Sequence, residues 1–99
     1  MARSKRVPTL NEVTADLKRL QREYRAMKLS ADDYESGLEV RLQVYDTGES
    51  FLRYGDPGYD TDHNGHWGSG VFDKDESPAG MRRLAMDLLS QVLDSIAQD

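Results

Sequence analysis

The side chains with the greatest chemical potential lie together in residues 55–70, which read GDPGYDTDHNGHWGSG. This stretch holds both histidines and the only tryptophan of the chain, five of its eight glycines, and three aspartates. Imidazole, carboxylate and indole groups on a glycine-rich segment can bind a metal ion or form a recognition surface, since loops often carry binding residues. The candidate binding residues are Tyr59, Asp60, Asp62, His63, His66 and Trp67.

A calcium site is one reading of this stretch. Residues 60–65, Asp-Thr-Asp-His-Asn-Gly, match the first half of an EF-hand loop, in which side-chain oxygens converge on one cation. Val71 occupies the twelfth position, where that loop needs a bidentate glutamate, and the flanking residues predict strands rather than helices. An EF-hand is therefore not expected, which leaves an irregular calcium site or a polar turn.

A zinc-type site is a second reading. His63 and His66 offer nitrogen ligands three positions apart, and Asp60 or Asp62 can add oxygen. Two histidines and one aspartate would leave a coordination position open, which is typical of catalytic zinc. A divalent-metal-binding module or small metalloenzyme built from these four residues is therefore the alternative to a protein without cofactor.

Most other catalytic classes lack a necessary residue. The chain has no cysteine, which excludes disulfides, cysteine-based zinc sites and thiol nucleophiles. Residues 62–64, Asp-His-Asn, match the opening of a ββα-metal nuclease site, but no histidine or asparagine follows His66 to complete it. Ser50 and Ser69 lack the context of a hydrolase nucleophile, and the glycines lack the lysine of a phosphate-binding loop. We therefore expect a non-catalytic protein without a cofactor.

Trp67 has two possible roles. With Tyr59, His63 and His66 it can form an exposed aromatic platform, because Tyr and Trp supply a large contact area at low entropy cost. Alternatively, the indole folds back and fills the small core. We expect a mixed outcome, in which Trp67 is partly buried and holds the loop while the other three side chains face outward.

Charge is distributed unevenly along the chain, although the net charge is −5. Residues 1–30 carry eight Lys/Arg against three acids, and residues 31–80 carry three basic and twelve acidic residues. The acidic middle should repel nucleic acid, so direct duplex binding is not expected.

The composition of residues 1–8 predicts a flexible basic tail, and residues 9–99 are expected to form a single domain. No apolar run reaches the length of a membrane span, and the composition suits the cytoplasm.

Hydrophobic periodicity predicts the elements that position the central stretch. Thr9 and Glu12 form a capping box for a first helix. This helix either ends near Leu29, with a second cap at Ser30 opening a short helix before Gly37, or runs on to Ser36; we favour the break. The apolar positions of the first helix are Leu10, Val13, Leu17, Leu20, Tyr24 and Met27.

Strict alternation over residues 38–45 predicts a half-buried strand, and the turn at residues 46–49 returns the chain as an antiparallel partner at 50–54. Residues 66–72 predict a third, irregular strand. Ser77 caps the last helix, with Pro78 at its first position. Its apolar arc is about 220° wide at 100° per residue, so it should contact the sheet and either the first helix or a second subunit. We favour a homodimer through the N- and C-terminal helices, broken by Leu89→Glu or Leu93→Glu.

These elements predict an α+β fold: an N-terminal helix, an antiparallel hairpin or three-stranded sheet, a long Gly/Asp-rich loop, and a C-terminal helix packed on the sheet. The pattern GDPGYDTDH-x-G-x-WG at residues 55–68, between an amphipathic hairpin and a helix, resembles small uncharacterised accessory proteins of bacteriophages and other mobile elements. The resemblance covers residues 38–98 and implies an accessory protein that acts against a host system. Together these features favour a non-catalytic acidic binding protein, of the phage accessory or inhibitor type, that engages a host macromolecular complex through the loop at 55–70 and the acidic surface.

Overall fold

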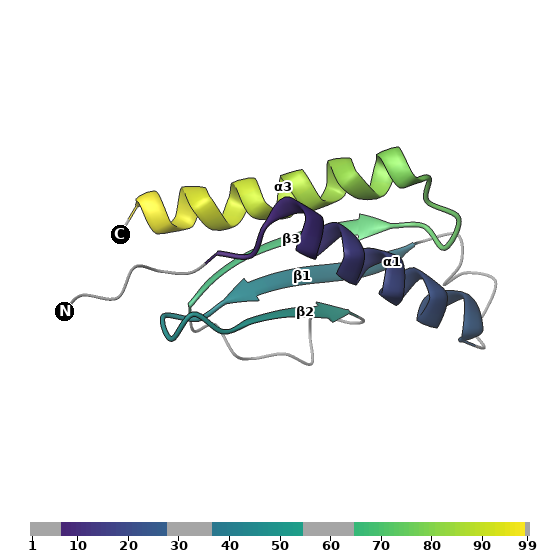
Figure 1. The fold of residues 1–99 in the computed structure, drawn as a ribbon, viewed down its shortest axis with the longest axis horizontal. Coiled ribbons are helices and arrows are strands. Elements are labelled where there is room, and N and C mark those ends of the chain that lie inside the picture. The colour runs from purple at the N-terminus through teal and green to yellow at the C-terminus, as the bar shows by residue number, and fades with distance from the viewer. Residues whose placement is uncertain (1–6, 28–36, 55–64, 99) are drawn as a thin grey trace.

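The computed structural model describes residues 7–27, 37–54 and 65–98 of the 99-residue chain. Helix α1 spans Leu10–Ala26 and helix α3 spans Pro78–Ala97. The three strands are β1 (Leu38–Val44), β2 (Ser50–Tyr54) and β3 (His66–Phe72). The fold is α+β, as predicted, with the two helices packed together and α3 running along β3 (Figure 1).

The sheet is antiparallel, with β1 in the centre and the strand order β2-β1-β3. Tyr54, the last residue of β2, lies opposite Val40, whereas His66, the first residue of β3, lies opposite Val44. The described residues that flank 55–64 therefore lie at opposite edges and opposite ends of the sheet. This placement follows from strand pairing between distant residues, which no local sequence pattern contains.

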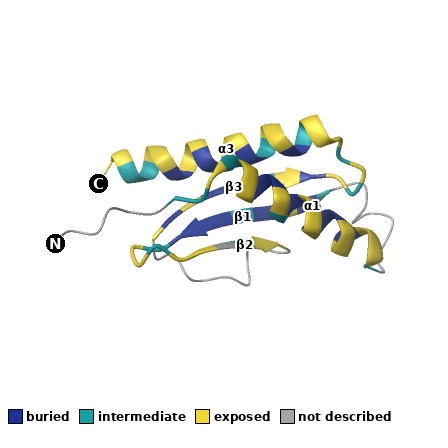
Figure 2. Cartoon of the chain, in the orientation of Figure 1, coloured by how far each residue is buried: buried dark blue, intermediate teal, exposed yellow. Residues whose placement is uncertain are grey.

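One face of the sheet forms the core with both helices (Figure 2). Strand residues alternate between faces, and the core face of β1 carries Leu38, Val40, Leu42 and Val44, all buried as predicted. Phe72 of β3 adds a buried ring that meets Tyr24 of α1 edge-on, with ring centroids 5.9 Å apart. The core is thus a single cluster to which α1, the sheet and α3 all contribute residues.

Helix α1 begins at the predicted capping box. The Glu12 backbone N–H donates to Thr9 Oγ1 at 3.2 Å, and the Thr9 backbone N–H donates to Glu12 Oε1 at 3.2 Å. The predicted apolar side of the helix faces the core. The helix ends at Ala26, earlier than predicted, and the short helix expected at 30–36 lies outside the described residues. Val7, which the predicted tail includes, packs against the core, and residues 1–6 lie outside the described residues.

Helix α3 divides its wide apolar arc between two neighbours. Ser77 caps it by accepting the Gly80 N–H at 3.0 Å, and the helix packs on the sheet and on α1. Leu89 is 9% exposed and belongs to the core, which argues against the expectation that Leu89→Glu leaves a folded protein. Leu93, in contrast, is 52% exposed.

Neither described helix combines the length and the apolar character that a membrane crossing requires.

Candidate functional site

The described part of the central stretch, residues 65–70, builds the beginning of β3. Tyr59, Asp60, Asp62 and His63 lie outside the described residues, as does the 60–65 calcium-loop pattern except for Gly65. Gly65 has a φ of +78°, a backbone conformation that L side chains rarely adopt, and a Cβ there would collide with the carbonyl oxygen of Val44. This glycine is needed for the entry of the chain into the sheet.

His66 and Trp67 lie on opposite faces of β3. Successive side chains of a strand point to opposite sides of the sheet, so two neighbouring residues cannot share one platform. His66 lies opposite Val44 on the core face and is 6% exposed, whereas Trp67 lies opposite Gln43 on the other face. The expectation that His66 faces outward beside Trp67 is therefore wrong.

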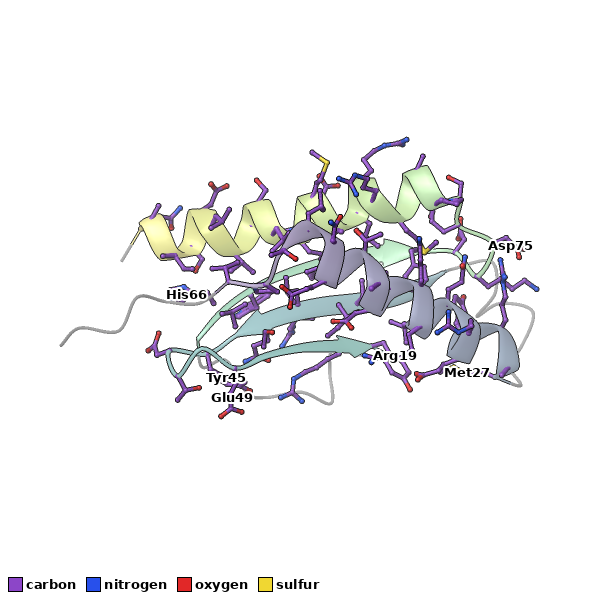
Figure 3. All side chains as sticks on the ribbon, viewed as in Figure 1. Arg19, Met27, Tyr45, Glu49, His66 and Asp75 are labelled. Atoms are coloured by element: carbon purple, nitrogen blue, oxygen red, sulfur yellow. The ribbon has the colours of Figure 1, made fainter. Side chains whose placement is uncertain are left out.

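The His66 imidazole connects β3 to the end of α3 (Figure 3). Its Nδ1 lies 2.8 Å from Ser95 Oγ, a hydrogen bond whose donor depends on the tautomer. Its Nε2 lies 4.0 Å from Asp46 Oδ1 in the β1–β2 turn, which is beyond hydrogen-bond distance. A serine and an aspartate thus flank the histidine, but the carboxylate does not bond the ring as a hydrolase triad requires. Sequence reasoning missed both neighbours because they lie far from His66 in the chain.

Trp67 lies outside the core, on the sheet face opposite the described helices. The indole is 38% exposed, which excludes the role of core plug. The Arg41 guanidinium carbon lies 4.5 Å from the ring centroid, a cation–π contact between diagonal neighbours on β1 and β3. On the same face, Arg53 Nη2 donates to Tyr45 Oη at 3.0 Å. Aromatic and guanidinium groups from three parts of the sheet therefore gather on this face.

Gln43 lies beneath this group and is completely buried, although it belongs to the face away from the helices. The alternation of β1 predicted a polar, solvated position there. The full burial of Gln43 shows that the sheet is packed on this side at the position opposite Trp67. The sequence holds no signal for this burial.

Gly68 and Gly70 have a structural role. They lie on the core face of β3, and a Cβ at Gly68 would come within 2.6 Å of the Leu88 carbonyl oxygen and 2.7 Å of Gln91 Cβ. The absence of side chains lets α3 lie close against β3. Gln91 then bonds the strand backbone: its Oε1 accepts the Ser69 N–H at 3.0 Å, and its Nε2 donates to the Ser69 carbonyl at 2.9 Å. Glycine in a strand signals such close approach, and that signal was available in the sequence.

Metal ligands do not converge within the part of the chain that the structure describes: residues 7–27, 37–54 and 65–98 contain no group of three or more His, Asp or Glu side chains suited to an ion. Of the four proposed metal ligands only His66 is among them, and its ring is turned toward Ser95. Comparison with protein-family models, with curated proteins and with solved structures finds no match to the chain.

Proposed function

We propose that this protein is a small, non-catalytic, acidic binding protein that engages a macromolecular partner through residues 55–70 and the surface around them. The observation that carries the proposal is Trp67, a large indole outside the core, 38% exposed, on the face that neither described helix covers. Trp and Arg are the residue types most enriched among those that dominate interface affinity. Trp67 with Arg41 against its ring supplies both at one place.

The charge of the surface indicates the kind of partner. Exposed acids of the described residues include Glu39 on β1, Asp46 and Glu49 in the β1–β2 turn, and Asp73 and Asp75 before α3. Such a surface attracts a basic partner and speeds its association. With the phage-type resemblance of residues 38–98, this favours a host defence or nucleic-acid-processing complex in the cytoplasm, whose DNA-binding surface the acids would mimic.

No cluster of possible metal ligands among the described residues supports metal binding. His66 is the one proposed ligand whose position is known, and it is buried on the core face beside Ser95. A metal site would therefore have to use a histidine that already ties β3 to α3. For this reason the binding function is the better supported of the two.

Affinity capture from host lysate with quantitative mass spectrometry tests the proposal. Wild type, Trp67→Ala and a matched control, Leu93→Ala, serve as baits; Leu93 is an exposed apolar residue on α3. The Trp67→Ala bait should lose at least about tenfold of the partner, equivalent to about 1.4 kcal/mol, while the Leu93→Ala bait keeps it. Equal capture by Trp67→Ala and wild type would reject Trp67 as the anchor and the proposal with it.

A further inference from the structure

The two edges of the sheet differ in how their backbone groups are satisfied. The Ser69 N–H and carbonyl both bond Gln91 of α3, so they point away from β1. In an antiparallel ladder the N–H and carbonyl of one residue point to the same side, and this side alternates along the strand. At the centre of the β3 edge, the Gln91 side-chain amide therefore satisfies the outward N–H and carbonyl of Ser69, as the backbone of a further strand would.

The same alternation identifies the outward groups of β2. Ser69 lies opposite Arg41, whose backbone groups must then point toward β2 and bond Arg53. The Tyr45 N–H donates to the Glu49 carbonyl at 2.8 Å. Tyr45 lies an even number of positions after Arg41, so this bond is directed to the same side, as the alternation requires. The residues of β2 that alternate with Arg53 are Ser50, Leu52 and Tyr54, so their N–H and carbonyl groups point outward from the sheet. No described element lies beyond them, because β2 ends the strand order.

Among the described residues, the side chains of β2 do not block this edge. Natural edges are blunted by proline, by charged side chains, lysine above all, or by a covering element, and β2 contains neither proline nor lysine. Its one charged side chain, Arg53, donates to Tyr45 Oη and is thereby directed along the sheet. Tyr54 is 48% exposed, and Leu52 is only partly buried against the core.

We propose that β2 pairs antiparallel with β2 of a second copy of this chain, forming a continuous six-stranded sheet around a two-fold axis at Leu52. This register pairs Leu52 with Leu52 of the other copy, and Ser50 with Tyr54 of the other copy, so every outward residue of β2 faces another outward residue. All of these pairs are of the hydrogen-bonded type. The interface uses the same residues on both copies, as a two-fold dimer requires.

One feature favours a second copy as the occupant, and another favours this register over its neighbour. Leu52 meets Leu52 on the core face, which extends the apolar layer across the axis and buries a side chain that the single chain leaves half covered. Arg53 stays out of direct opposition to Arg53, whereas a two-fold axis at residue 53 would place these like charges opposite each other. This inference does not rest on the proposed function, since it is argued from the backbone groups of β2 and not from Trp67.

Sedimentation of the full chain with charge variants tests the pairing. Wild type should sediment as a dimer of the 11.2-kDa chain at high micromolar concentration. Ser50→Lys/Tyr54→Lys places lysines directly opposite each other at both ends of the interface and should raise the dissociation constant at least about tenfold. Ser50→Glu/Tyr54→Lys, the matched control, places opposite charges there and should keep the dimer. Both positions are exposed, so either variant should fold.

Cysteine crosslinking places the axis, because the chain has no native cysteine. Leu52→Cys should crosslink to its own copy with a short thiol reagent, while the exposed control Leu93→Cys on α3 should not. A monomeric wild type would refute the pairing, as would a dimer that responds equally to the two charge variants. Crosslinking at residue 93 without crosslinking at residue 52 would assign the dimer to the helices instead.

Discussion

Tyr24 and Trp67 are two large aromatic residues in contrasting environments. Tyr24 has no exposed surface and contacts the Phe72 ring, whereas Trp67 lies outside the core. Truncating a fully buried aromatic side chain costs about 3–5 kcal/mol. We expect Tyr24→Ala to lose that much or to unfold, and Trp67→Ala to lose about 1–2 kcal/mol. Urea denaturation measures both, and equal losses would contradict this placement of Trp67.

The burial of His66 and its hydrogen bond to Ser95 predict how metal ions affect stability. An ion bound at a hundred times its dissociation constant stabilises the folded state by about 2.7 kcal/mol. Because His66 is buried and bonded to Ser95, we expect excess zinc or calcium to leave the melting temperature unchanged. Thermal melts with each ion and with a chelator check this. A rise that His66→Gln abolishes would restore the metal hypothesis.

At the scale of elements, the seat of α3 on β3 depends on Gly68. A Cβ at this position meets the backbone of α3 at Leu88, which can move only if the helix moves. Overpacking of this kind costs about 1–3 kcal/mol, so Gly68→Ala should lower the free energy of unfolding by that amount. Ser69→Ala is the matched control: its side chain is exposed and only its backbone bonds Gln91, so it should cost less than about 0.5 kcal/mol.

Helix α3 also offers one buried and one exposed leucine at which the effect of an introduced charge can be compared. Leu89 lies in the core and Leu93, one turn later, is exposed. An unpaired carboxylate in an apolar core is strongly destabilising, so Leu89→Glu should unfold the domain, while Leu93→Glu should keep its far-UV circular dichroism and its melting temperature within a few degrees. A folded Leu89→Glu protein would mean that α3 is seated differently.

For the whole molecule, the net charge of −5 opposes association with nucleic acid. Affinity for duplex DNA comes largely from the release of counterions by basic side chains, which an acidic surface does not produce. We expect no band shift at about 150 mM salt. A salt-sensitive shift that disappears when residues 1–8 are deleted would assign DNA binding to the basic N-terminal residues.

Local pattern was enough to predict most of the elements. The cap at Thr9, the apolar side of α1, the alternation of β1, the turn at Gly48 and the cap at Ser77 all appear where the sequence predicts them. Each depends on residues within a few positions of one another, because helices and strands repeat at fixed short periods. The α+β class follows from the order of these elements.

The arrangement of the candidate site depended on tertiary structure. Whether His66 or Trp67 faced the core depended on the register of β3 with β1, and a shift of one residue would exchange them. Ser95 and Gln91 belong to α3 and come close to β3 through the packing of that helix on the sheet. Arg41 belongs to β1 and comes close to Trp67 through the pairing of β1 with β3. The sequence by itself determined the elements and the residues available for binding; strand pairing decided which of those residues reach the surface, because it joins segments that local periodicity cannot relate.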